Sequence, residues 1–71
     1  MVKVQIRGRA IRKMLAQRNR QQKWLAAELG ITSGYMAQLL NGDRGPSPEL
    51  RQKIQMCFEG KSFHELFSIQ K

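Results

Sequence analysis

The sequence has few of the residues on which catalytic and metal sites depend. It holds one cysteine and one histidine in 71 residues, which excludes an internal disulfide and makes a thiol and imidazole metal cluster a poor prospect. We expect Cys57 to be a buried small apolar side chain. His64 lies in a helix-capping sequence with no nucleophile at motif spacing, so we interpret it as a surface helix residue. The sequence therefore predicts no enzyme, no metal site and no cofactor.

Long apolar runs are also missing. No stretch approaches the roughly 18 consecutive apolar residues of a membrane-spanning helix, and no apolar segment follows the basic start as in a signal peptide. We therefore expect a soluble cytoplasmic protein that does not enter a membrane. A chain of this length forms one domain and buries only about 60% of the surface that its unfolded form exposes. We therefore expect a small module of modest stability.

Acidic residues are scarce, and the first third of the chain has none. Thirteen lysines and arginines oppose five aspartates and glutamates, which gives a formal net charge of +8 and a pI of about 10.7. The basic residues before Trp24 are Lys3, Arg7, Arg9, Arg12, Lys13, Arg18, Arg20 and Lys23. Such a distribution favours a polyanionic partner. Duplex nucleic acid and an anionic membrane both satisfy it, and the missing apolar runs make the membrane the weaker choice.

The segment from Val2 to Arg7 alternates strictly between apolar and polar residues, which predicts an extended strand with one covered face. Gly8 interrupts the pattern, so we divide the chain into an extended arm at residues 1–8 and a domain at residues 9–71. The strand could pair with the tail from Ser68 to Lys71, pair with its copy in a second subunit, or lie over the helices. A disordered arm is the remaining alternative.

From Arg9 onward the apolar residues follow helical spacing, which predicts five helices. The successive apolar stripes are Ile11, Met14, Leu15; Leu25, Ala26, Leu29; Met36, Leu39, Leu40; Leu50, Ile54, Cys57, Phe58; and Phe63, Leu66, Phe67. The residues that signal helix ends are Asn19, Gly30, Thr32, Asn41, Gly42, Ser47, Pro48, Gly60, Ser62 and Glu65. The predicted fold class is all-α, a compact five-helix domain behind an extended arm.

The two helices between Gln22 and Asn41 carry a family pattern. Their small, turn and core positions are Ala26, Gly30, Leu25, Leu29, Ile31, Met36 and Leu39. At these positions the chain resembles the helix-turn-helix of the lambda-repressor-like family, the Cro and cI type also called XRE. The resemblance extends to Gln22, to the Asn41-Gly42 pair and to the Pro46-Ser47 pair, and it covers roughly Ile11 to Leu66. Gln21 departs from it, because many members have serine or threonine as the cap of the second helix.

The resemblance implies double-stranded DNA as the partner, with the helix at residues 32–41 docked in the major groove. A groove about 12 Å wide admits one helix. We predict that the outward side chains read bases, and they are Ser33, Gly34, Ala37 and Gln38. Gln38 can pair with an adenine edge and Ala37 can pack on a thymine methyl group, whereas Gly34 offers only close backbone approach. The predicted phosphate contacts are Gln22, Lys23, Thr32, Tyr35, Asn41 and Arg44.

The resemblance also implies a twofold dimer on a palindromic site. The candidate interface is an apolar surplus of four residues, Met56, Phe63, Phe67 and Ile69, for which core packing is the alternative. The expected function is that of a sequence-specific transcriptional regulator, a repressor of prokaryotic or phage type that is nucleoid-associated when bound. The alternative is an antitoxin-like or adaptor module that binds a partner protein and for which DNA binding is secondary.

Overall fold

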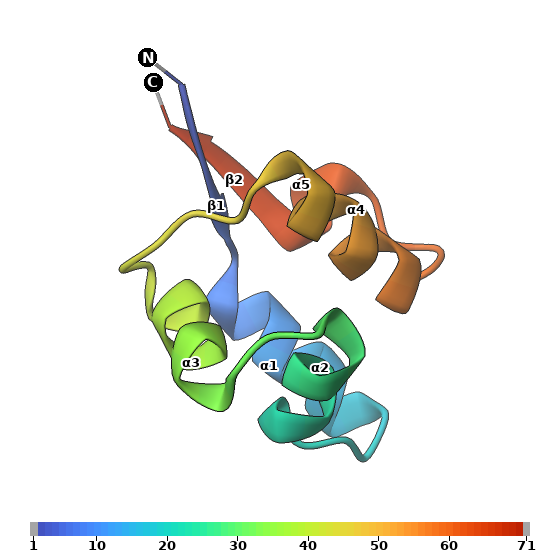
Figure 1. Ribbon diagram of the computed structural model, residues 1–71. Coiled ribbons are helices and arrows are strands. Elements are labelled where there is room, and N and C mark those ends of the chain that lie inside the picture. Colours follow the sequence, from blue (N-terminus) through green and yellow to red (C-terminus); the bar gives the residue numbers. More distant parts are fainter. Residues whose placement is uncertain (1, 71) are drawn as a thin grey trace.

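The computed structural model describes residues 2–70, which form five helices and two short strands (Figure 1). In chain order these elements are β1 (Lys3–Ile6), α1 (Gly8–Gln17), α2 (Gln22–Leu29), α3 (Ser33–Asn41), α4 (Pro48–Cys57), α5 (Phe63–Leu66) and β2 (Phe67–Gln70). In Figure 1, α1, α2 and α3 lie together at one end of the molecule. The strands project from the other end, beside α4 and α5. Residues 1 and 71, which the predicted arm and tail include, lie outside the described residues.

The two strands correct the predicted all-α class, because they form an antiparallel sheet. Ile6 pairs with Phe67, and Val4 pairs with Ile69. Of the arrangements open to the N-terminal segment, pairing with the chain's own tail is the one observed. Arg7 continues the connection, since its amide donates to the Leu66 carbonyl at 2.8 Å and its Nε donates to the His64 carbonyl at 2.7 Å.

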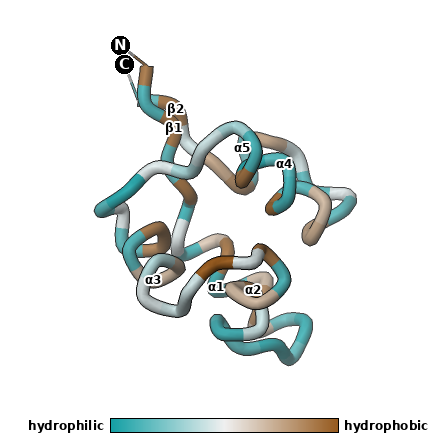
Figure 2. Tube along the Cα trace, in the orientation of Figure 1, coloured by the Kyte–Doolittle hydropathy of each residue, from teal (hydrophilic) through white to brown (hydrophobic). Residues whose placement is uncertain are grey.

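The helix ends follow the local signals in the sequence. Gly30 closes α2 in the left-handed conformation, with a φ of 72° that few other residues adopt without strain. Thr32 caps α3 by accepting the Tyr35 amide at 3.1 Å. Ser62 and Glu65 form the expected capping box at the start of α5. Figure 2 shows hydrophilic segments at the turn between α1 and α2 and at the tip of the loop after α3.

The predicted apolar stripes meet in one core. Its buried residues are Ile6, Ile11, Met14, Leu15, Leu25, Ala26, Leu29, Met36, Leu39, Leu40, Leu50, Ile54, Phe58, Leu66 and Phe67. Cys57 differs from the expectation, because it is only partly buried at the end of α4 and Phe58 fills the core beside it. This partial burial raises the pKa of the Cys57 thiol. The negative charge of Glu28 raises the pKa further, and the positive charge of Arg18 opposes the increase.

The proposed dimer residues separate in the fold. Phe67 is completely buried, because β2 carries it into the core opposite Ile6, so its side chain cannot contact a second subunit in this fold. Phe63 is partly buried, whereas Met56 and Ile69 are 74% and 48% exposed. Phe67 thus packs in the core, which was the alternative to a place in the dimer interface.

Within residues 2–70, none of the helices combines the length and apolar character that a membrane crossing requires. The described part of the chain likewise groups no three histidine, cysteine or acidic side chains in a way that could hold a metal ion.

Candidate nucleic-acid interface

The turn between α2 and α3 sets which side of α3 faces outward. After Gly30, the Ile31 amide donates to the Ala26 carbonyl at 3.0 Å, which fixes the chain reversal. The apolar sides of both helices then face the core through Leu25 and Leu29 on α2 and through Met36 and Leu39 on α3. The opposite side of α3 is left open to a partner.

The predicted base-reading residues share that open side. Their spacing along α3 places them on adjoining turns, and Ser33, Gly34 and Gln38 are exposed while Ala37 is partly buried. A Cβ added at Gly34 would meet no atom within 4 Å, so the first turn of the helix has free space in front of it. Gln38 is the one long polar side chain in this group. The face can approach a flat or grooved surface closely.

Two groups of predicted phosphate contacts flank this face. Lys23 is exposed and Gln22 partly buried in the first turn of α2, where the side chain of the N-cap residue Gln21 forms no capping hydrogen bond. First-turn amides that lack such a cap can bind an anion, and the helix dipole favours this. On the other side, the Arg44 guanidinium lies 5.9 Å from the centroid of the Tyr35 ring. Both ends of the face thus carry a cation.

Thr32 and Asn41 are already engaged within the protein. The Thr32 hydroxyl oxygen accepts the Tyr35 amide, so this residue has a structural role as the cap of α3. The Oδ1 of Asn41 accepts a hydrogen bond from Arg12 Nη2 at 3.0 Å, which leaves the Asn41 amide group as the donor toward a phosphate. Arg12 therefore joins the site through α1. From the sequence only the charge of Arg12 could be recognised, because its partner Asn41 is 29 positions away along the chain.

Three arginines of the basic first third make contacts inside the protein. Arg7 donates to carbonyls at the end of α5, and Arg18 Nη1 donates to the Cys57 carbonyl at 2.7 Å while its guanidinium stacks on Phe58. Arg20 stacks on Trp24 at 4.9 Å. Among residues 2–70, the one ion pair within 4.0 Å joins Lys61 to Glu65, far along the chain from these cations. The positive charge around α3 is consequently not neutralised internally.

The sequence model of a family described as helix-turn-helix matches residues 11–66, well over half of the chain. The protein belongs to this helix-turn-helix family, of the Cro/cI or XRE type. Neither the comparison with curated proteins nor the comparison with solved structures gives a significant match. As a family member, the protein is a DNA-binding regulator of transcription in general terms. Within the helix-turn-helix, α2 and α3 are the central pair, and both strands lie outside the matched residues.

Proposed function

We propose that this helix-turn-helix protein is a sequence-specific repressor that places α3 in the major groove of duplex DNA and acts by occupying its site, without catalysis. The observation that supports this most directly is the open face of α3, with Gln38 as its one long polar side chain, flanked by Lys23 on α2 and Arg44 on the following loop. This arrangement matches a groove lined with base edges between two rows of phosphates.

Each residue then has a defined part in recognition. The Gln38 amide donates to and accepts from an adenine edge, and the Ala37 methyl group packs on a thymine methyl. Ser33 bonds to several bases and discriminates less, while Gly34 lets the helix backbone approach the bases. Because one side chain carries most of the direct readout, the DNA shape supplies a further part of the preference.

The phosphates set the docking. Gln22 and Lys23 contact one DNA strand at the start of α2. Tyr35 in the first turn of α3, Asn41 at its end and Arg44 in the following loop contact the other DNA strand, and Thr32, the cap of α3, lies close to the DNA backbone. Arg12 is a positioning residue here, because its hydrogen bond to Asn41 Oδ1 occupies that oxygen and leaves the Asn41 amide nitrogen as the donor to a phosphate.

Salt titration tests the proposal as a whole. The logarithm of the affinity should fall linearly with the logarithm of salt concentration, with a slope of about −0.9 for each phosphate contacted. Affinity for a duplex should therefore drop more than about tenfold between ~50 and ~200 mM salt. Fluorescence anisotropy with a random duplex gives this slope. No measurable binding at the lower salt concentration would contradict the proposal.

Paired substitutions test the assignment of the two kinds of contact. Gln38→Ala should weaken binding to a site selected from a random pool by about 1–3 kcal/mol and leave binding to random duplex almost unchanged. Lys23→Ala should weaken both alike and make the salt slope about 1 unit shallower. Competition titrations with both duplexes separate the effects, and the reverse pattern would exclude this assignment of roles.

A second subunit would compensate for the sparse readout. Two copies on a palindromic site double the number of base contacts, with half-sites about 34 Å apart. Of the predicted interface residues, Met56 and Ile69 are exposed and Phe63 is partly exposed, so these three remain candidates for the contact. Phe67 is left out because of its burial.

One observation favours the second candidate function, that of a protein-binding module. An open groove between α2 and α4 is lined by Trp24, Glu28, Lys53, Met56 and Cys57, and the Met56 side chain is 74% exposed there. A flexible methionine beside an aromatic ring is typical of adaptable protein contacts. Undetectable duplex binding in the salt titration would favour this function over the first.

A further inference from the structure

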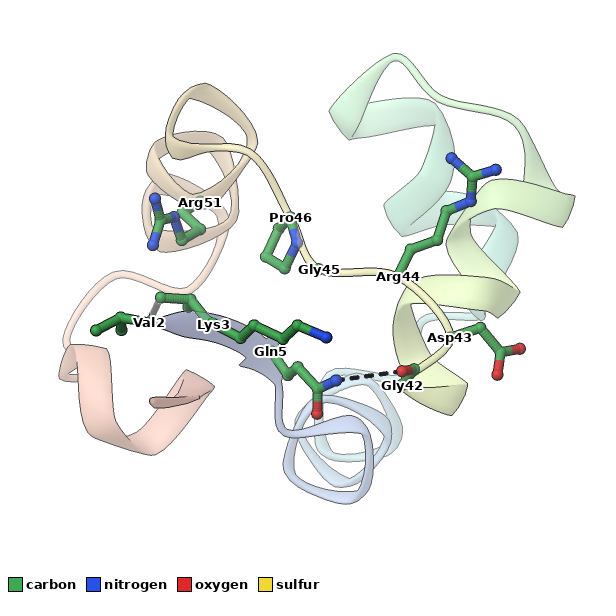
Figure 3. A pocket seen from close by; sticks show the side chains of 10 residues that line it. Val2, Lys3, Gln5, Gly42, Asp43, Arg44, Gly45, Pro46 and Arg51 are labelled. Atoms are coloured by element: carbon green, nitrogen blue, oxygen red, sulfur yellow. Dashed lines mark hydrogen bonds between the residues drawn. The ribbon is translucent and has the colours of Figure 1, made fainter. Parts of the chain in front are cut away.

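A basic cleft lies beside the loop that follows α3 (Figure 3). It has a volume of about 380 Å³ and is formed by three separate parts of the chain. Residues from β1 make one wall, the loop from Gly42 to Pro46 makes another, and Arg51 of α4 closes the end. Neither strand belongs to the residues that the family model matches, so this wall is an addition to the helix-turn-helix.

The cleft is held in place by direct contacts between β1 and the loop. Gln5 Nε2 donates to the Gly42 carbonyl at 3.3 Å, and Gln70 Nε2 donates to Gln5 Oε1 at 2.9 Å, so both strands fix the Gln5 amide. At Gly45 an added Cβ would lie 2.7 Å from the Val4 carbonyl oxygen, so only glycine allows this close approach without a shift of the backbone. The sheet therefore supports the loop that carries Arg44.

The charges in the cleft are arranged for an anion. Figure 3 shows the Lys3 side chain extending from β1 toward Gly42 of the loop, whereas Arg51 lies on α4 at the other side of the cleft. Arg44 leaves the loop in another direction, toward Tyr35, and the Asp43 carboxylate points away from Lys3. Neither Lys3 nor Arg51 takes part in the one ion pair among residues 2–70. Two cations that form no ion pair thus line a concave site beside the loop that carries Arg44, one of the predicted phosphate contacts.

We propose that this cleft is a second phosphate site, in which Lys3 and Arg51 bind a backbone phosphate of DNA outside the base pairs that α3 reads. The proposal rests on the DNA-binding function proposed above. A phosphate oxygen accepts hydrogen bonds from the Lys3 ammonium and the Arg51 guanidinium, and neither contact depends on the base sequence. The ribbon of β1 and β2 lengthens the footprint of a recognition helix that has few base contacts of its own.

Methylphosphonate linkages test this site, because each one removes the charge of a single phosphate. A site selected from a random pool is prepared with one such linkage at a time in its flanks. For the wild-type protein, one flanking linkage should weaken binding by about three- to tenfold. For the Lys3→Gln, Arg51→Gln double variant, the same linkage should have no further effect, and the salt slope should be shallower by about 1.

The matched control is the Lys13→Gln, Lys53→Gln double variant, which removes the same amount of charge elsewhere. Lys53 lies two positions from Arg51 but lines the groove between α2 and α4, and Lys13 lies on α1. This control should keep the sensitivity to the flanking linkage. Thermal unfolding of both double variants checks that the fold is intact.

The outcomes separate the two proposals. If the wild-type protein binds its site but no flanking linkage matters, the cleft is not a phosphate site while the DNA-binding function stands. The same conclusion holds if both double variants respond alike to every linkage. If the wild-type protein binds no duplex at all, the proposed function fails and the phosphate site fails with it.

Discussion

Replacement of Phe67 by aspartate should leave the protein unfolded at 25 °C. The Phe67 side chain is completely buried, its ring centroid lies 4.9 Å from that of Phe63, and its backbone pairs with Ile6. Removal of a buried phenylalanine side chain costs about 3–5 kcal/mol, and an unpaired carboxylate in the core adds to that loss. A single domain of this size has little more stability than this. Loss of the far-ultraviolet circular dichroism signal and of a cooperative thermal transition would report the effect.

The matched control is Ile69→Asp, which introduces the same carboxylate two residues along β2. Ile69 is 48% exposed, so the variant should stay folded and lose at most about 1 kcal/mol. Sedimentation of Ile69→Asp beside the wild-type protein then tests the proposed dimer contact without unfolding the subunit. A Phe67→Asp variant that melts cooperatively near the wild-type temperature would contradict the buried position of Phe67.

The local parts of the fold could be predicted because their causes are local. Ser62 and Glu65 form a capping box three residues apart, and the turn at Gly30 needs only one residue that tolerates a positive φ. Helical spacing likewise decides which side of α3 is apolar, so the open positions of Ser33 and Gln38 follow from the sequence. The outward face of α3 could therefore be predicted from the sequence.

The pairing of β1 with β2 could be expected only as one of several arrangements. An alternating strand shows which residues share a face but not which distant segment supplies its partner. Here the partner of Ile6 is 61 positions away, at Phe67. Phe67 also continues the helical stripe of Phe63, so its pattern predicted a surface or a core equally well. The backbone becomes extended at Phe67, and this change turns the side chain into the core.

The contacts that support the candidate site could not be predicted from the sequence, because they also join residues that are far apart along the chain. Arg12 meets Asn41 across 29 positions, and Gln5 meets Gly42 across 37. No periodicity connects residues at such separations, and charge alone did not distinguish Arg12 from Arg7 or Arg18, which bind carbonyl groups. The site thus depends on the tertiary packing of α1 and β1 against α3 and its loop.

Two glycines near this packing should respond to alanine in opposite directions. Gly8 begins α1, and a Cβ there would overlap the carbonyl oxygen of Leu40 in the last turn of α3. Either α1 or the end of α3 must move, which we expect to lower the stability by about 1–3 kcal/mol. Gly34 has open space in front of it within α3, so Gly34→Ala should raise the stability by up to about 1 kcal/mol.

Thermal unfolding measures both effects, because 1 kcal/mol corresponds to about 4–8 °C in Tm for a domain of this size. Gly8→Ala should also weaken DNA binding, since a shift of α1 or of the last turn of α3 changes the distance between Arg12 and Asn41. The Arg12→Ala variant is the control for this effect, because it removes the hydrogen bond without displacing the backbone. An equal Tm for Gly8→Ala and the wild-type protein would show that α1 does not lie against Leu40, and would remove the proposed positioning of Asn41 through α1.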